Sequence, residues 1–352
     1  FGKSSHTNTQ LSIYINVVLN IENRAMSENL VKRQHFVPRT YLKHFGEADG
    51  AEYLVHVLPE SSTKKDTIFQ SNIKNVALEK HLYTLPGKTI AQKMAIEKFY
   101  SDQLEQHYDS IYEILTDPKK TEVTSEQREL IISTVVTMYY RTTKWVNASR
   151  NLKSRVLERA FQLCEQTGKD YFTYEEQKIS IKGRELKEFT AEWNKKRQPG
   201  MIITQLETAL NLINIRLAND GICVIKIEND KLELVTSDNP VIASNNNPER
   251  FAPFDPTNIL KLPLDSKHLL MLMPENAEGL ENRIFRRNSV RPFSEIEKLT
   301  SNYSQMQNSE RFMFGSKSAL ESYLDTKQES ERPLEEGEST ADIFAKLREL
   351  GL

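Results

Sequence analysis

The sequence has few cysteines and no long apolar run. Its 352 residues include two cysteines, Cys164 and Cys223, which lie far apart and show no CxxC spacing. A disulfide framework and a Cys-rich zinc site are therefore not expected. Both cysteines have apolar neighbours, which indicates reduced core residues of a cytoplasmic protein. No run approaches the roughly 18 apolar residues of a membrane helix, so we expect no membrane partner. The apolar segment at residues 11–21 is short and is interrupted by Asn16 and Asn20.

An excess of charge of either sign is also missing. The 47 Lys and Arg residues nearly balance the 49 Asp and Glu residues, which gives a formal net charge of -2. This balance gives no case for general binding to nucleic acid or membrane surfaces, although it allows a local basic patch. The motifs GxxxxGK, GxSxG, HExxH and GxGxxG after a strand do not occur. Nucleotide-dependent and zinc-protease chemistries are therefore not expected.

The two ends of the chain differ from its middle. Residues 1–25 start without Met and end just before Met26, so we expect a tag, a vector scar or translated upstream sequence. Residues 326–340 are charged and poor in apolar residues, which predicts a flexible linker. An amphipathic helix is predicted over residues 341–352, where it could pack on its own domain or dock a partner protein. Its apolar side would be formed by Ile343, Phe344, Leu347 and Leu350.

Between these ends we expect one domain, residues 26–325, whose middle is a helical block at about residues 89–218. Apolar residues recur there with a period near 3.6. The segment TSEQ at residues 124–127 is a helix-capping signal. The helix that follows, in one piece or two, should end at Gly168. Two further helices are predicted over residues 186–196 and 202–218.

A β-rich block follows at about residues 219–316, where the period changes to two. Two alternating runs around Asn229 and Asp230 predict a hairpin. Further strands are predicted from ILKLPLD, HLLMLMP and RFMFG, and, near the start of the domain, from EYLVHVL and DTIFQ. We therefore expect an α+β fold, in which a central helical bundle layer packs on a mainly antiparallel sheet formed by N-terminal and C-terminal strands.

The segment QHFVPRTYLKHF, residues 34–45, carries the first candidate functional residue, His35. Pro38 favours an extended residue before it, and Arg39 begins a short predicted helix. His35 would then lie at a strand-to-helix corner, where its ring could face a cleft or bond backbone groups. Arg39 and His44 also match the RxxxxH spacing of HEPN-type ribonucleases, although so short a pattern arises by chance and the HEPN helix should be long.

Two further polar clusters are candidates. Asp238 and Asn239 follow the apolar run KLELV, where they could form a routine Asx-turn or hold catalytic groups at a strand end. Arg141 lies inside a long apolar helical stretch and needs a carboxylate or phosphate partner. Lys144 and Arg150 follow it at near-helical spacing, among aromatic residues. This stripe could hold a nucleic-acid backbone or form a solvated helix face.

Several of these segments resemble the DUF4238 family, a domain of unknown function. The resemblance rests on HFVPRTYLKHF, VALEKHLYT, the RTTK segment at Arg141, TSDNPV, the ILKLPLD and LLML strands, and Asn308 before RFMF. It covers about residues 34–316 and implies a shared fold. Thr143 stands where Pro is common in the family. No catalytic residue can be transferred, but His35, Arg141 and Asp238 all fall within the segments that carry the resemblance.

These observations lead to two functional hypotheses. The first is a phosphodiester hydrolase, a nuclease effector of a bacterial defence or toxin system. His35 would act as general base or ligand, Asp238 would orient it or bind a divalent metal such as Mg²⁺, and Arg141 would hold the phosphate. Nucleic acid would be the partner. The second hypothesis is a non-catalytic binding or regulatory protein that docks a partner through its helical face and C-terminal helix. In the first, the substrate would be bound by Arg39, Asn239, Lys144 and Arg150.

Overall fold

The computed structural model describes residues 30–247, 249, 252–274, 279–333, 339, 342 and 345–346. The predicted upstream segment, residues 1–25, lies outside the described residues. So does the proposed apolar side of the C-terminal helix, formed by Ile343, Phe344, Leu347 and Leu350. The described chain has the α+β fold that the sequence predicts. It is built on two five-stranded sheets instead of the single sheet expected.

The first of these, the C-terminal sheet, has the strand order β10-β11-β12-β8-β13. Its neighbours are antiparallel, except that β13 runs parallel to β8. Because side chains alternate between the two faces of a strand, Ile222 and Val224 belong to the main core, whereas Ile225 and Ile227 pack in a separate cluster with Leu232 and Leu234. The strands are β8 (Asp220–Ile227), β10 (Ile242–Ser244), β11 (Ile259–Pro263), β12 (His268–Pro274) and β13 (Ile284–Ser289).

The second sheet, called the joining sheet, combines N-terminal and C-terminal strands in the order β2-β3-β14-β9, with β4 also paired to β3. The prediction that strands from both ends of the domain share a sheet is therefore confirmed. Two short ladders, β1 with β5 and β6 with β7, complete the strands. The bounds are β1 (Arg33–His35), β2 (Glu47–Asp49), β3 (Glu52–Pro59), β4 (Phe69–Asn72), β5 (Leu78–Lys80), β6 (Tyr171–Tyr174), β7 (Gln177–Ser180), β9 (Thr236–Ser237) and β14 (Phe312–Gly315).

The hairpin predicted around Asn229 and Asp230 does not form. The segment that follows these residues is not a strand, and β8 pairs instead with β12 and β13. Leu232 and Leu234 are nevertheless buried, and Lys267 Nζ donates to the backbone carbonyls of Asn229, Asp230 and Leu232 at 2.6–3.1 Å. The alternating pattern in this segment therefore reflects the burial of alternate side chains and not the pairing of strands.

The helical block lies at the centre of the domain, as predicted. Nearly every residue in the second half of α6 is buried, including Ile131, Ile132 and Val135. The capping box at Thr124 and the left-handed Gly168 at the end of α7 are both present. The helices are α2 (Arg39–Leu42), α3 (Ile90–Lys93), α4 (Ala95–Gln103), α5 (Tyr108–Thr116), α6 (Ser125–Tyr140), α7 (Thr143–Thr167), α8 (Leu186–Asn219), α9 (Phe293–Asn308) and α10 (Lys317–Glu331). Single 3₁₀ turns occur at Lys43–Phe45, Lys65–Thr67, Ile73–Asn75 and Glu105–His107.

Two helix boundaries differ from the prediction. The helices expected over residues 186–196 and 202–218 form one continuous α8, with Pro199 inside it. Proline normally interrupts a helix, but packing of α8 against α6 and α7 overrides this local preference. At the other end of the chain, α10 continues to Glu331, so the start of the predicted linker is helical. Buried Thr326 holds that turn against the body.

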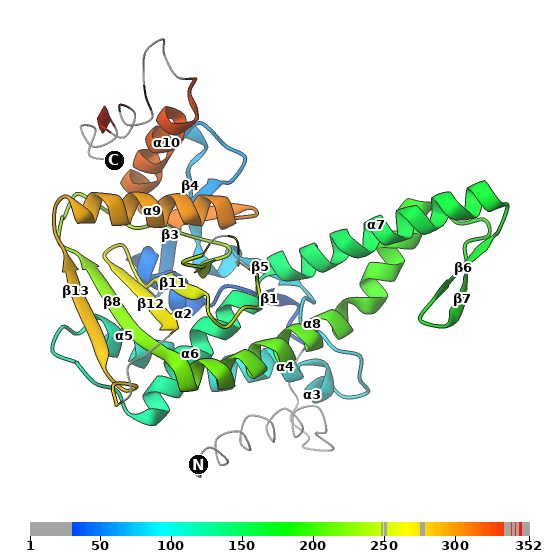
Figure 1. Ribbon diagram of the computed structural model, residues 1–352, viewed down its shortest axis with the longest axis horizontal. Coiled ribbons are helices and arrows are strands. Elements are labelled where there is room, and N and C mark those ends of the chain that lie inside the picture. Colours follow the sequence, from blue (N-terminus) through cyan, green and yellow to red (C-terminus); the bar gives the residue numbers. More distant parts are fainter. Residues whose placement is uncertain are drawn as a thin grey trace.

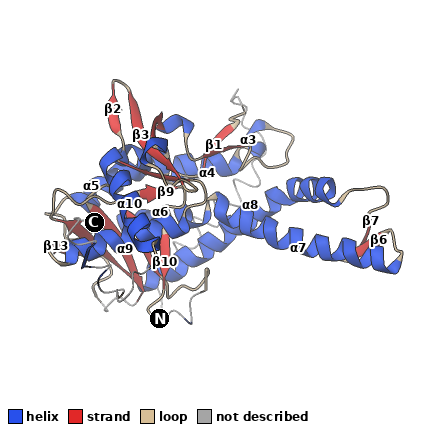
Figure 2. Cartoon of the chain, turned by 90° about the horizontal axis from the view of Figure 1, so that it is seen from above, coloured by secondary structure: helices blue, strands red, loops and turns tan. Residues whose placement is uncertain are grey.

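Part of the helical block projects from the body as an arm, which the sequence did not predict. α7 and the first part of α8 run side by side, and the β6–β7 hairpin lies at the far end (Figure 1). Figure 2 shows the same projection from a second direction. A small separate core of Leu157, Phe161 and Phe189 stabilises the tip.

In the described part of the chain, no helix is long and apolar enough to cross a bilayer.

Candidate functional site

His35 lies at the strand-to-helix corner that the sequence predicts. It is the last residue of β1, and α2 begins at Arg39. The backbone of Lys74 lies near the ring and acts to raise the pKa of His35. Its Nε2 is shielded from solvent and has no hydrogen-bond partner among the described residues. In the neutral tautomer that carries its proton on Nδ1, Nε2 has a free lone pair. Burial and then the charge of Arg39 lower the pKa of His35 to about 4, so the ring is neutral at neutral pH.

Arg141 lies against His35. It is the C-cap residue of α6, and Nη2 of its buried guanidinium donates to the His35 carbonyl at 2.7 Å. The same nitrogen is 2.8 Å from Glu105 Oε1, and the guanidinium lies over the Tyr100 ring, 4.1 Å from its centroid. The Arg141 side chain is only 2% exposed. Arg141 therefore holds the backbone of His35 in place, and the prediction that it grips a substrate phosphate directly does not fit its position.

Glu97, on α4, completes this group of ionisable side chains. Its Oε2 is shielded from solvent and, within the described chain, forms no hydrogen bond. Burial raises the pKa of Glu97 to about 7, with the Glu105 charge acting in the same direction and the Arg141 charge opposing it. The charge of exposed Arg39 acts on both Glu97 and His35. We call this group the His35 cluster: His35, Arg39, Glu97, Glu105 and Arg141.

Sequence reasoning missed Glu97 and Glu105. Neither lies in a recognisable motif, and both come from the first helical segment, which was interpreted only as core packing. One signal was available: Glu97 directly follows Ala95 and Ile96 and precedes Phe99, all of which are buried. A carboxylate set so closely among core positions of a helix is costly to bury without a partner, and so indicates a special role.

Asp238 lies in a different network. Its carboxylate is fully buried, and its two oxygens accept the backbone N–H groups of Glu310 at 2.9 Å and Arg311 at 2.7 Å. Burial raises the pKa of Asp238 to about 6, although these two N–H groups act in the opposite direction. Within the described chain, the carboxylate accepts hydrogen bonds from Glu310, Arg311 and Asn239 and none from His35. Asp238 therefore anchors the entry to β14, and its expected role of orienting His35 is not supported.

Asn239 and Lys144 are committed to the same structural network. The side chain of Asn239 donates to the Asn308 carbonyl at 3.0 Å, and Asn308 Nδ2 returns a bond to the Asn239 carbonyl at 2.7 Å. Lys144 Nζ donates to Asn308 Oδ1. Burial lowers the pKa of Lys144, with the charges of Glu310 and Asp238 opposing this shift. Both side chains fasten the end of α9, so neither is placed to bind the substrate as predicted.

Arg150 and Arg39 differ in how far they are free to bind an anion. Arg150 donates to Gln198 Oε1 at 2.5 Å and to Asn147 Oδ1 at 3.2 Å, and it is 3.9 Å from Glu79. It therefore fixes the base of the arm. Arg39 is exposed on the first turn of α2. Of the four residues predicted to bind substrate, Arg39 is the one placed at the surface of the His35 cluster.

The RxxxxH pattern does not form a HEPN-type site. α2 has only four residues, Arg39–Leu42, and His44 lies in the 3₁₀ turn that follows it. The His44 ring stacks on Tyr112 at 3.6 Å between centroids, and its Nε2 is 3.7 Å from Asp109. Arg39 and His44 thus belong to separate surroundings, and the long helix that would align them is missing from this described segment.

The predicted divalent metal was also tested against the side chains. Asp238, the expected ligand, already uses both oxygens to accept backbone N–H groups. Across the described ranges there is no group of three or more His, Cys, Asp or Glu residues placed to hold a metal ion. Because the donor set does not fit Mg²⁺, we derive no step through a metal.

Comparison with known proteins gives one match. A family described as "Protein of unknown function (DUF4238)" matches residues 33–319, most of the chain. No curated protein matches, and no solved structure matches. The resemblance inferred from the sequence motifs is therefore confirmed over nearly the range expected.

Proposed function

The chain belongs to the DUF4238 family, and from its own geometry we propose that it is a phosphodiester hydrolase whose reaction centre is the His35 cluster. One observation carries the proposal. His35 and Glu97 have pKa values displaced in opposite directions, to about 4 and about 7, around the same three charges. Pairs of titratable groups with environments that push their pKa values apart are typical of general acid–base sites.

The proposed reaction assigns one proton transfer to each side chain. Nε2 of neutral His35 accepts a proton from the attacking water, whose oxygen forms the new bond to phosphorus. Protonated Glu97 donates its proton to the oxygen that leaves as the P–O bond breaks. Exposed Arg39 pairs with the phosphate. The phosphate then offsets the positive charge of Arg39, which lowers the pKa of His35, and so makes His35 a stronger base.

Arg141 and Glu105 act through the other residues. Arg141 fixes the His35 backbone by its 2.7 Å hydrogen bond, and Glu105 neutralises the buried guanidinium at 2.8 Å. Nε2 of His35 and Oε2 of Glu97 are shielded from solvent. In this proposal, a local movement at exposed Arg39 lets the substrate reach them. Arg141 is therefore a positioning residue in this proposal.

The pH dependence of cleavage provides a first test. His35 must be neutral and Glu97 protonated, so the rate should rise with pH through about 4 and fall through about 7. We expect Glu97→Gln to abolish the upper limb. A chromogenic phosphodiester and single-stranded RNA and DNA are suitable substrates. A rate of the pure protein that is flat across this range would contradict the assignment of both groups.

Substitution provides the second test. His35→Ala and Glu97→Gln should each lower kcat by about 100- to 10,000-fold. The matched control is His81→Asn, a nearby exposed histidine with positive φ, which Asn tolerates; it should retain full activity. Folding is checked by circular dichroism. If folded His35→Ala and Glu97→Gln cleave like the wild type, the proposal fails; it fails equally if the wild type cleaves no phosphodiester.

A role as a nuclease effector of a bacterial defence or toxin system makes a cellular prediction. Expression of the wild type in a bacterial host should slow growth and degrade nucleic acid, and His35→Ala should relieve both effects. The alternative, a non-catalytic binding protein, is favoured by a separate observation: an open groove at the base of the arm. Growth inhibition that persists unchanged with His35→Ala and Glu97→Gln would support binding without cleavage.

A further inference from the structure

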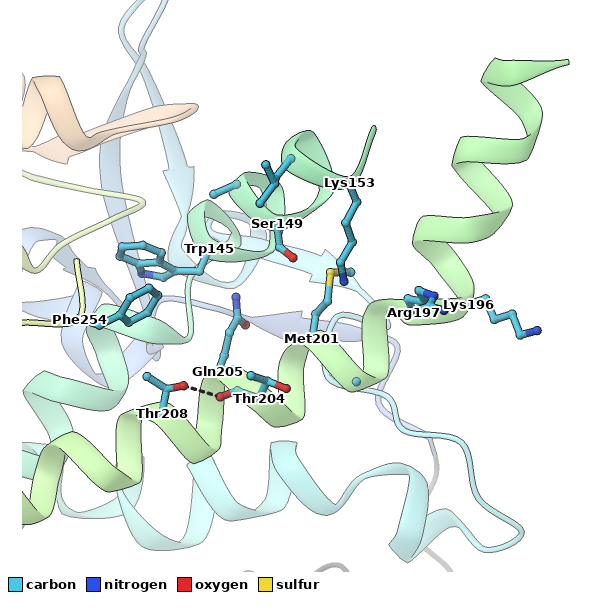
Figure 3. A pocket seen from close by; sticks show the side chains of 13 residues that line it. Trp145, Ser149, Lys153, Lys196, Arg197, Met201, Thr204, Gln205, Thr208 and Phe254 are labelled. Atoms are coloured by element: carbon cyan, nitrogen blue, oxygen red, sulfur yellow. Dashed lines mark hydrogen bonds between the residues drawn. The ribbon is translucent and has the colours of Figure 1, made fainter. Parts of the chain in front are cut away.

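An open groove lies between α7 and α8 at the base of the arm, and we call it the arm groove. Its volume is about 730 Å³, within the usual range for ligand sites of roughly 300–1,000 Å³. Aromatic side chains lie at one end and basic side chains toward the other (Figure 3). Its lining includes Trp145, Lys153, Lys196, Arg197, Gly200 and Phe254.

The aromatic end is a rigid, partly exposed shelf. The Trp145 indole N–H donates to the Tyr139 carbonyl at 2.7 Å, which fixes the ring. Phe254 stacks on Tyr140 at 5.6 Å between centroids and 8° between planes, and lies 5.5 Å from Trp145. Phe254 nevertheless remains 53% exposed. An exposed ring held in one orientation by other rings is well suited to stack on a flat ligand.

The basic end gathers cations. Lys153, Lys196 and Arg197 line it, and none of the described residues lining the groove is acidic. Arg197 is paired with Glu175 at 3.1 Å, but Glu175 lies outside the lining. Burial and then the charge of Arg197 lower the pKa of Lys153, while the charge of Glu175 raises it. A phosphate bound at this end of the groove would add a favourable interaction with these cations.

A flat apolar shelf beside a cluster of cations matches one ligand chemistry: a nucleobase joined to phosphate. We propose that the arm groove binds single-stranded nucleic acid, with a base on Phe254 and Trp145 and a phosphate of a neighbouring nucleotide at Lys153 and Lys196. The open groove admits a continuous strand, and hydrogen-bonding side chains such as Gln205 point into it (Figure 3). Duplex nucleic acid would not expose its base faces to the shelf.

The groove is connected to the His35 cluster through the base of the arm. Ser149 lines the groove, and its neighbour Arg150 lies 3.9 Å from Glu79. Glu79 is the β-ladder partner of Gln34, which precedes His35. A strand that runs from the groove past the base of the arm would be a candidate substrate of the proposed hydrolase. Its identification as substrate rests on the proposed function, whereas binding in the groove does not.

Gly200 allows the groove to be filled without disturbing the fold. A Cβ built on Gly200 meets no atom within 4 Å, and a larger residue would also favour the helix. Gly200→Leu should therefore block the groove, while Gly200→Ala should bind nearly as the wild type does. Phe254→Ala removes the exposed ring, and Phe69→Ala, another exposed phenylalanine on β4, is its matched control.

Fluorescence anisotropy of the full chain with labelled oligo(dT) and oligo(U) of about 15 nucleotides tests these variants. Phe254→Ala and Gly200→Leu should raise Kd about 5- to 100-fold without changing its salt dependence. Lys153→Gln and Lys196→Gln should each reduce the slope of log Kd against log salt by about 0.7; exposed Lys231→Gln should not. Unchanged binding by Phe254→Ala and Gly200→Leu would overturn the proposal.

Further measurements identify the source of the ligand and separate the two proposals. Equal affinity for a mononucleotide, or for duplex of the same length, would overturn the assignment to single strands. His35→Ala should bind like the wild type. Binding without cleavage by the wild type would end the proposed hydrolase and leave the groove assignment standing. Cleavage that persists with unchanged binding in Phe254→Ala would end the groove assignment alone.

Discussion

Glu97 and Asp238 are both acidic side chains shielded by the fold, and burial raises the pKa of each. Their hydrogen bonds differ. Both oxygens of Asp238 accept backbone N–H groups, from Glu310 and Arg311, whereas Oε2 of Glu97 has no partner in the described chain. A raised pKa alone therefore does not separate structure from function. The distinction lies in whether the surrounding chain has already satisfied the carboxylate.

The two sites also differ in what a substrate would gain. At Asp238 an incoming group would have to displace two short hydrogen bonds that hold β14 in register. At Glu97 it would supply a partner that is missing. A buried polar atom without a hydrogen bond is costly, so a ligand that pairs with Glu97 recovers free energy that the folded chain alone does not.

The largest effect on stability is expected from Asp238→Ala. This substitution leaves the buried N–H groups of Glu310 and Arg311 without an acceptor, and each unsatisfied group costs about 1–3 kcal/mol. We expect the free energy of unfolding to fall by about 3–5 kcal/mol, measured by urea denaturation. The protein that remains folded should keep its activity within about twofold, well short of the 100-fold or larger loss expected for a catalytic group. Full stability with a loss of cleavage like that of His35→Ala would instead place Asp238 in the reaction centre.

Glu97→Gln should raise the free energy of unfolding above neutral pH, whereas Asp238→Ala lowers it. The pKa of Glu97 is raised from 4.5 to about 7, so within this window the folded chain binds more protons than the unfolded chain. Stability contributed by this group therefore falls as pH rises through the window, and above it ionised Glu97 costs at most about 3 kcal/mol. The variant should be more stable than the wild type at about pH 8 and should gain nothing at about pH 4. If the variant and the wild type have the same free energy of unfolding at both pH values, Glu97 is solvated in the folded protein.

The same contrast explains what could be predicted from the sequence. Periodicity and capping located α6 and strands such as β3, β11 and β12, because they depend on neighbouring residues. The position of His35 at a corner followed from Pro38 in the same way. The partners of Arg141 and Asp238 could not be found, since Glu105, Glu310 and Arg311 are distant or lie outside any motif. A buried Arg or Asp in the sequence predicts that a partner exists, and it does not say whether that partner is the chain itself or a ligand.

The arm illustrates a second limit. Pro199 and Gly200 interrupt the helical pattern locally, yet α8 passes through both because α6 and α7 pack along it. The arm groove exists only because this helix is continuous. Its lining combines residues from α7, α8 and the turn that carries Phe254. No stretch of sequence contains the groove, and the basic stripe expected from Lys144 and Arg150 is not part of its lining.

The smallest effect on stability is expected from Arg141→Lys. Arg141→Lys keeps the positive charge but cannot lie flat over Tyr100 while donating to both His35 and Glu105. We expect a loss of about 1–2 kcal/mol in the free energy of unfolding and a fall of about tenfold in kcat, because His35 loses its fixed position. The lower limb of the pH–rate profile should stay near 4, since the charge that acts on His35 is retained. If Arg141 gripped the phosphate directly, KM would rise instead while kcat stayed constant, so the split between the two constants separates a positioning role from a binding one.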